Sequence, residues 1–197
     1  MELKPVLLPF GKTIYQTKQG QLISSDNSHL VDFLLQRETE NFQTVLDLGC
    51  GNGILSLMLA HYRPAWRITG IEIQPHLVEI AQKNCQLTEA TNVDIQLQNL
   101  RCWQSEQTWD LIVCNPPYHP LNSGKISPIK EKAISRHELC CNMLDILTFI
   151  KGNLKLSGKA YLIYAPNRTF DLEKFTKKVD LNIERRFSSK KNRKESI

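Results

Sequence analysis

The tetrapeptide Asn115-Pro116-Pro117-Tyr118 has the most distinctive chemistry in this sequence. Neither a helix nor a strand continues through two consecutive prolines, so these residues must form a stiff turn after the apolar run 109–114. In such a turn the Asn115 side-chain oxygen and the Pro116 carbonyl can both accept from one exocyclic amino group, which is otherwise a poor nucleophile. They would orient it toward an electrophile and stabilise the positive charge that develops on it, while Tyr118 stacks on a planar substrate. We therefore predict that these four residues are catalytic.

A second stretch, from Val45 to Ile54, contains three glycines within five positions. An aliphatic run stops at Gly49 and another begins at Ile54, which predicts a buried strand, a tight turn and a helix N-terminus. Such a turn brings bare backbone close to a ligand and directs N–H groups toward it. The third glycine of the dinucleotide pattern G-x-G-x-x-G would fall at Ile54, so the spacing argues against a nicotinamide cofactor.

Glu72 ends the next predicted strand, 66–73. It follows Gly53 by about 20 residues, the interval at which an acidic side chain reaches ribose hydroxyls in doubly wound folds. A carboxylate at the end of a strand can accept from both hydroxyls at once. An ordinary surface acid is the alternative, but the nearby glycine turn favours the ribose interpretation.

The string D-L-G-C-G-N-G at 47–53 resembles the first motif of the seven-strand, Rossmann-like S-adenosylmethionine methyltransferases. In that family the glycine backbone packs against the methionine and ribose parts of S-adenosyl-L-methionine, which carries no phosphate. The family usually has Asp after the third strand to bind the adenine amino group, and this sequence has Asn99 there. The resemblance therefore implies a cofactor site made of Asp47, Gly49, Gly51, Gly53, Glu72, Asn99 and Asn115.

The stretch 115–138 narrows the resemblance. N-P-P-Y is similar to the catalytic motif of amino-group methyltransferases that act on adenine, guanine or glutamine. Together with the loop at 123–125 and K-A-I-S-R-H-E at 132–138, it is similar to the bacterial tRNA adenine-N6 methyltransferases that modify valine tRNA next to its anticodon. This second resemblance runs from about residue 6 to residue 187. It implies that Tyr118, Arg136 and His137 contact the substrate.

The implied function is methyl transfer from S-adenosyl-L-methionine to the N6 amino group of a tRNA adenine, which has to be unstacked to reach the pocket. Three alternatives stay open. Guanine-N2 methylation of ribosomal RNA is the nearest, because N-P-P-Y-H at 115–119 is also similar to those enzymes. Glutamine-N5 methylation of a protein is next, and the last is a non-catalytic RNA-binding module. Intact Asp47, Glu72 and Asn115 argue against the last of these.

The resemblance implies an α/β fold, with a Rossmann-like, mostly parallel seven-strand methyltransferase sheet. We expect a hairpin from segments 6–8, 12–17 and 21–23, a lead-in helix after the cluster 24–28, and further strands at 45–48, 66–73, 93–97, 109–114, 159–164 and 181–187. Residues 188–197 contain one aliphatic residue, so the last strand is expected to be missing or displaced. The expected division is 1–40 for the hairpin and lead-in helix, 41–187 for the methyltransferase domain and 188–197 for a basic tail.

Two more local patterns lie in the C-terminal third of the chain. Ser135 and Glu138 fit a capping box that would begin an apolar helix running to Ile150. Near the end, six basic residues are compatible either with phosphate contacts to RNA, with tRNA as the expected partner, or with a solvated end. These residues are Arg185, Arg186, Lys190, Lys191, Arg193 and Lys194.

The composition limits the classes of protein to consider. A chain of 197 residues with 41% hydrophobic content fits one globular domain, and no apolar run approaches the roughly 20 residues of a membrane span. The first residues lack a basic region followed by an apolar core, so we expect a cytoplasmic protein without a membrane partner. The sequence does not determine the oligomeric state, and a monomer is the expectation. The six cysteines form no C-x-x-C pair and the five histidines no H-x-x-x-H pair, so we expect reduced core cysteines and no metal site.

Overall fold

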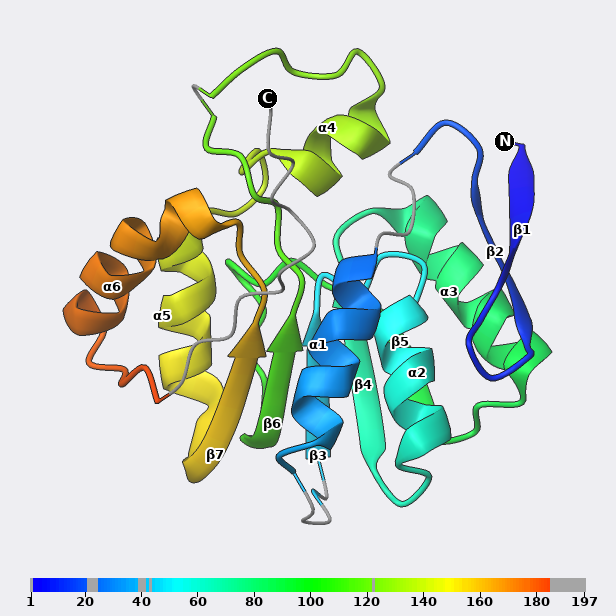
Figure 1. Ribbon diagram of the computed structural model, residues 1–197, viewed down its shortest axis with the longest axis horizontal. Helices are drawn as coiled ribbons and strands as arrows, with labels where there is room; N and C mark the ends of the chain where they lie inside the picture. The colour runs from blue at the N-terminus through cyan, green and yellow to red at the C-terminus, as the bar shows by residue number, and fades with distance from the viewer. Residues whose placement is uncertain (1, 21–24, 39–41, 43, 122, 185–197) are drawn as a thin grey trace, which may run out of the picture.

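The computed structural model describes residues 2–20, 25–38, 42, 44–121 and 123–184 (Figure 1). A five-stranded sheet of order β5-β4-β3-β6-β7 forms the centre, and all four strand pairings in it are parallel. A separate two-stranded sheet lies beside α3. The expected Rossmann-like, mostly parallel α/β architecture is confirmed. No helix among the described residues is long and apolar enough to cross a membrane.

The N-terminal half alternates strands with helices, as the apolar runs predict. The hairpin of β1 (Leu3–Leu7) and β2 (Thr13–Thr17) is antiparallel, and the expected segment 21–23 lies outside the described residues. Helix α1 begins within the predicted capping cluster. The elements that follow are α1 (Ser25–Leu35), β3 (Thr44–Leu48), α2 (Ile54–Tyr62), β4 (Arg67–Glu72), α3 (Pro75–Thr88), β5 (Val93–Leu97) and β6 (Trp109–Cys114).

The C-terminal half completes the sheet and adds a helix above its carboxyl edge. In Figure 1 this helix, α4, lies over the tips of the strands, and α6 lies beside α5. The elements are α4 (Lys130–Arg136), α5 (Met143–Asn153), β7 (Leu154–Leu162), the 3-10 turn η1 (Pro166–Arg168) and α6 (Thr169–Lys178).

The structure contradicts one prediction for this half and part of another. Ser135 lies inside α4 and does not begin a helix; α5 starts at Met143, where Asn142 and Asp145 form the capping box through bonds of 2.9 and 3.0 Å. The expected strand 181–187 is irregular over residues 181–184, and residues 185–187 lie outside the described residues. So do residues 188–197, which bear on the basic tail and on the missing or displaced last strand.

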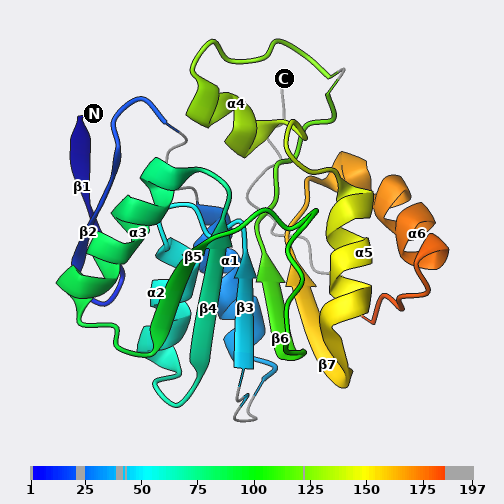
Figure 2. The ribbon, with the colours of Figure 1, turned by 180° about the vertical axis from the view of Figure 1, so that it is seen from behind.

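The sheet is apolar on both faces because alternate residues of each strand point to opposite sides. On one face Val45 and Leu111 meet α1 and α2, which lie in front of the sheet in Figure 1. On the other face Leu46 and Ile112 meet α5, which Figure 2 shows from behind.

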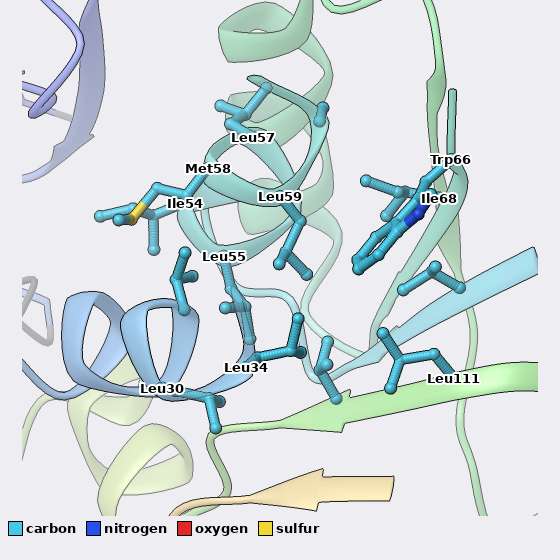
Figure 3. Close-up of a cluster of buried hydrophobic side chains, with 14 of the residues drawn as sticks. Leu30, Leu34, Ile54, Leu55, Leu57, Met58, Leu59, Trp66, Ile68 and Leu111 are labelled. Atoms are coloured by element: carbon cyan, nitrogen blue, oxygen red, sulfur yellow. The ribbon is translucent and has the colours of Figure 1, made fainter. Parts of the chain in front are cut away.

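Helix α2 lies at the centre of the larger cluster. Every residue from Ile54 to Ala60 is buried, because α1, α3 and the sheet enclose this helix. In Figure 3, Leu55 and Leu59 point toward Leu34 of α1 and Leu111 of β6. This packing fixes the start of α2, and with it the position of the glycine turn that precedes the helix.

Candidate functional site

A cavity of about 410 Å³ opens at the carboxyl ends of the central strands. This is where ligands bind in open parallel sheets, because the loops that leave neighbouring strands converge there. Helix α4 and the end of β2 contribute further walls. Of the predicted site residues, the cavity is lined by Asp47, Gly49, Gly51, Glu72, Asn99, Asn115, Pro116, Pro117, Tyr118 and Arg136, but not by Gly53 or His137.

The three glycines of the turn have two different roles. Gly49 and Gly51 adopt φ angles of 72° and 58°, and nothing lies within 4 Å of where a side chain would begin, so they present open backbone to the cavity. Gly53 also has positive φ, but a Cβ there would lie 3.3 Å from the Ala81 Cβ. The structure therefore uses Gly53 to let α2 approach α3, and not to line the cavity as the resemblance implied.

The Asp47 carboxylate lies 1% exposed beneath the glycine turn. Its Oδ2 accepts from the backbone N–H of Ser56 at 3.1 Å and from the Ser56 hydroxyl at 2.7 Å. Asp47 thereby satisfies a free N–H in the first turn of α2 and holds the turn against the sheet. Burial raises the pKa of Asp47 to about 7, although both hydrogen bonds from Ser56 oppose that shift.

Glu72 joins β4 to the glycine turn. Its Oε1 accepts from the backbone N–H groups of Ile73 and Gln74 at 3.0 Å, and its Oε2 accepts from that of Gly51 at 3.1 Å. Burial raises the pKa of this carboxyl, while the backbone donors pull it down. Since a carboxylate has about four acceptor positions, Oε2 keeps capacity for a ligand hydroxyl.

Asn99 lies on the cavity wall just after β5. Its Oδ1 accepts from the backbone N–H of Arg101 at 3.1 Å, which closes the turn that follows the strand. An amide oxygen has two lone pairs, so this turn leaves Asn99 able to accept from a ligand amino group.

The Asn115 amide is held by two side chains. Its Nδ2 donates to the Asn27 Oδ1 at 2.9 Å, and its Oδ1 lies 2.8 Å from the Tyr118 hydroxyl. The same hydroxyl lies 2.9 Å from the Asp26 Oδ2. The first turn of α1 therefore fixes which end of the Asn115 amide is the donor and which is the acceptor.

The hydroxyl of Tyr118 makes the side-chain contacts to Asp26 and Asn115. Burial, followed by the charge of Asp26, raises the pKa of the phenol, so the hydroxyl stays protonated and donates. Neither Asp26 nor Asn27 was predicted as a site residue, because in the sequence they read only as part of a helix-capping cluster. Stacking of Tyr118 on a substrate remains a prediction.

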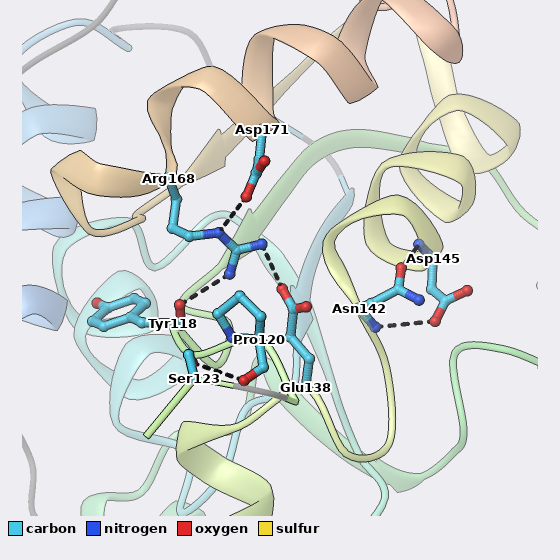
Figure 4. A network of polar contacts seen from close by, with 8 residues as sticks. All are labelled: Tyr118, Pro120, Ser123, Glu138, Asn142, Asp145, Arg168 and Asp171. Atoms are coloured by element: carbon cyan, nitrogen blue, oxygen red, sulfur yellow. Dashed lines mark hydrogen bonds and ion pairs between the residues drawn. The ribbon is translucent and has the colours of Figure 1, made fainter. Parts of the chain in front are cut away.

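Arg168, which sequence reasoning also missed, fixes the backbone of the same turn. It is 4% exposed, and its Nη1 donates to the Tyr118 carbonyl oxygen at 2.9 Å. Its Nη2 and Nε donate to Glu138 and Asp171, each at 2.9 Å (Figure 4). All three sides of the guanidinium are thus used, which a lysine could not reproduce.

Arg136 is the last residue of α4 and His137 follows it, but their side chains lie in different surroundings. Arg136 is exposed at the rim of the cavity, whereas His137 is 5% exposed and packs beside His119, with ring centroids 5.3 Å apart. Of the three predicted substrate contacts, Tyr118 and Arg136 therefore line this cavity, and His137 does not.

No cluster of three or more metal-ligating side chains occurs within the described ranges. All six cysteines are free.

The model of the methyltransferase small domain family matches residues 26–136, more than half of the chain. The chain belongs to this family. The match begins at α1 and ends at α4, so it includes the glycine turn, Glu72 and the N-P-P-Y turn.

Two curated relatives and one solved structure show what this family member is similar to. It is 31% identical over 156 residues to a tRNA1(Val) (adenine(37)-N6)-methyltransferase of Aliivibrio salmonicida, which covers 70% of this chain and 63% of the relative. It is 33% identical over 94 residues to a release factor glutamine methyltransferase of Streptococcus pneumoniae, covering 47% and 33%. The chain thus spans less than two thirds of either relative.

The solved structure is a 16S rRNA N2 methyltransferase of T. thermophilus in complex with AdoMet and guanosine. It superposes with a TM-score of 0.64 at 20% identity, over 88% of this chain and 45% of that one. At this identity the likeness shows a shared fold.

Proposed function

We propose that this chain is an S-adenosyl-L-methionine-dependent methyltransferase that modifies the N6 amino group of an adenine in tRNA, of the valine-tRNA anticodon-loop type. The observation that carries the proposal is that Asn115 lines the same cavity as the glycine turn and Glu72. An oriented acceptor for an amino group and a predicted cofactor site therefore meet in one pocket.

The cavity fits the proposed cofactor in size and in chemistry. Its volume is within the range of small-molecule sites, roughly 300–1,000 Å³. When bound, S-adenosyl-L-methionine supplies an electrophilic methyl group on a positively charged sulfonium. The buried carboxyls of Asp47 and Glu72 give the wall a negative character when they are ionised, and this suits the cation. The Glu72 Oε2 can accept from the ribose.

The N-P-P-Y turn acts on the nucleophile. With the cofactor bound, the adenine nitrogen would take the methyl group as the carbon–sulfur bond broke with its electron pair on sulfur, and positive charge would develop on the nitrogen. Asn115 Oδ1 and the Pro116 carbonyl accept from the amino group and stabilise that charge, and one nitrogen proton then leaves to solvent. No side chain needs to remove the proton beforehand.

Binding of the base has to change the contacts of Tyr118. The hydroxyl of Tyr118 now occupies one acceptor position of Asn115 Oδ1. The incoming amino group either uses the second lone pair or displaces this hydroxyl, and the displaced ring then becomes available to stack on the base.

Guanine-N2 and glutamine-N5 methylation use the same geometry, because each substrate presents a planar NH₂ group. The similarity to a release factor glutamine methyltransferase supports a protein glutamine as an alternative substrate, beside the guanine of ribosomal RNA. We favour adenine in tRNA because the 31% identical relative bears that name and its match is longer.

The test is to incubate the purified chain with methyl-labelled S-adenosyl-L-methionine and an unmodified valine-tRNA transcript, followed by nucleoside mass spectrometry. We expect N6-methyladenosine. A ribosomal RNA fragment and a release factor are offered in parallel, and label found only in N2-methylguanosine or in methylated glutamine would replace the adenine assignment.

A further inference from the structure

A second cavity, of about 550 Å³, lies inside the loop that follows the N-P-P-Y turn. Its wall includes Lys125, Lys132 and Arg136 together with His119 and His137. His119 and Arg136 also line the first cavity, so the two cavities adjoin at these residues.

The loop around this cavity is closed at its base. The backbone N–H of His119 donates to the Arg136 carbonyl at 3.0 Å, and that of Glu138 donates to the His119 carbonyl at 2.9 Å. Arg168 binds both Glu138 and the Tyr118 carbonyl, so it ties this closure to the catalytic turn. A ligand in the second cavity would therefore lie beside the turn that carries Asn115.

The charge of the second cavity is positive. Three cationic side chains line it without a carboxylate, and the structure pairs none of the three with an acid within the residues it describes. Glu131, the acid of the same helix, is directed elsewhere and bonds with Thr17 at 2.6 Å and His76 at 3.0 Å.

The spacing of Lys132 and Arg136 within α4 favours an anionic ligand. Lys132 and Arg136 are one turn apart, a spacing at which like charges disfavour an isolated helix. The pKa of His119 responds to this positive charge, because burial lowers it first and the charge of Arg136 lowers it further. An anion held between these side chains would remove the repulsion.

We propose that the second cavity binds a backbone phosphodiester of the RNA, next to the nucleotide whose base enters the first cavity, with Lys125, Lys132 and Arg136 as the contacts. The inference rests on the proposed function, because it needs one RNA strand to cross both cavities. Phosphate contacts fix the register of a nucleic acid without reading its sequence. A glutamine-bearing peptide would bring no such anion.

The first experiment removes charge. Lys125→Gln and Lys132→Gln should each weaken binding of a valine-tRNA transcript about tenfold, as expected for the loss of a charge-assisted contact. Each should also reduce the slope of log affinity against log salt by about one unit. Lys178→Gln, at the end of α6, is the matched control and should change neither quantity. Wild-type affinity and slope in both loop variants would overturn the proposal.

The second experiment removes the charge from the RNA. Two anticodon stem-loops are compared, and each carries a single neutral methylphosphonate linkage. In one RNA the linkage precedes the target adenine, and in the other it follows the adenine. One of these should weaken wild-type binding about as much as Lys132→Gln, and it should cost the Lys132→Gln variant nothing more. Additive losses at both linkages would show that Lys132 does not hold that phosphate.

The readouts separate this subsite from the proposed function. Cofactor affinity, measured by calorimetry, should be unchanged in Lys125→Gln and Lys132→Gln. If the protein methylates the tRNA but neither neutral linkage weakens RNA binding, the subsite is rejected and the proposed activity is kept. An RNA that binds with the expected linkage dependence but receives no methyl group would reject the proposed activity and keep the subsite.

Discussion

The guanidinium of Arg168 donates a 2.9 Å hydrogen bond to the backbone oxygen of Tyr118, across 50 residues of sequence. The bond holds the backbone of the last residue of the N-P-P-Y turn, while Asn27 and Asp26 bond with the side chains of Asn115 and Tyr118. The turn is therefore fixed by tertiary contacts as well as by its two prolines. Arg168 touches neither proposed ligand and is a positioning residue.

We predict that Arg168→Lys lowers kcat about 10- to 100-fold, because misplacement of a reacting group by 1 Å has effects of that size. Lysine keeps the positive charge near Glu138 but cannot make three bonds in the plane of a guanidinium. The affinity for S-adenosyl-L-methionine and the KM for RNA should change little. Steady-state kinetics and calorimetry measure the three quantities.

Asp171→Asn is the control for Arg168. It weakens the contact to Nε and leaves the Tyr118 carbonyl bond in place, so kcat should stay close to wild type. Thermal unfolding of both variants shows how much stability each has lost. If Asp171→Asn lowered kcat as much as Arg168→Lys at equal stability, the bond to Tyr118 would not be the contact that matters.

Asn115 gives a second prediction. Asn115→Ala should lower kcat by about 100-fold or more, the size of effect seen when one transition-state hydrogen-bond partner is removed. Cofactor affinity should remain close to wild type, because the acceptor acts mainly as the amino nitrogen gains charge. Asn115→Asp keeps an acceptor and should retain more activity than Asn115→Ala. Wild-type turnover in Asn115→Ala would rule out the proposed mechanism.

The buried carboxyls predict a pH dependence. Burial raises the pKa of Asp47 to about 7, above that of an unfolded aspartate, so the folded protein holds this proton more tightly. Its contribution to stability is complete below about pH 4 and is lost as the pH rises through about 7. Binding of the cationic cofactor favours the ionised form. Affinity should therefore increase between about pH 5.5 and pH 8, with protons released on binding.

Calorimetry in two buffers of different ionisation enthalpy measures that proton release. Asp47→Asn keeps an oxygen that can accept from the Ser56 N–H and removes the titrating group, so it should flatten most of the pH dependence. Glu72, whose pKa burial also raises, accounts for any remainder. Unchanged proton release in Asp47→Asn would assign the effect to another group.

The apolar runs of the sequence were enough to predict which residues lie at the carboxyl ends of the parallel strands. Glu72 ends β4, whereas Gly49 and Asn115 directly follow β3 and β6, and the carboxyl ends of parallel strands share one edge of the sheet. Asn27 and Arg168 could not be predicted in this way. Their bonds to the N-P-P-Y turn span 88 and 50 residues, and no periodicity encodes contacts at that separation.

The misplaced capping box shows the same limit. Ser135-x-x-Glu138 and Asn142-x-x-Asp145 both fit the pattern for the start of a helix. Tertiary contacts determine which of the two begins a helix. The Glu138 carboxylate accepts from Arg168, and Ser135 lies inside α4. Sequence spacing gave no means of choosing the second site over the first.

Tyr118 gives the last prediction, which separates the role of its ring from that of its hydroxyl. If the ring stacks on the target base, Tyr118→Ala should weaken RNA binding by about 1–3 kcal/mol, whereas Tyr118→Phe should stay close to wild type. The Phe variant also frees Asn115 Oδ1 from the tyrosine hydroxyl, so its kcat should not fall. Fluorescence anisotropy and single-turnover kinetics measure both effects. A Phe variant as impaired as the Ala variant would show that the hydroxyl, through Asp26 and Asn115, is what the reaction needs.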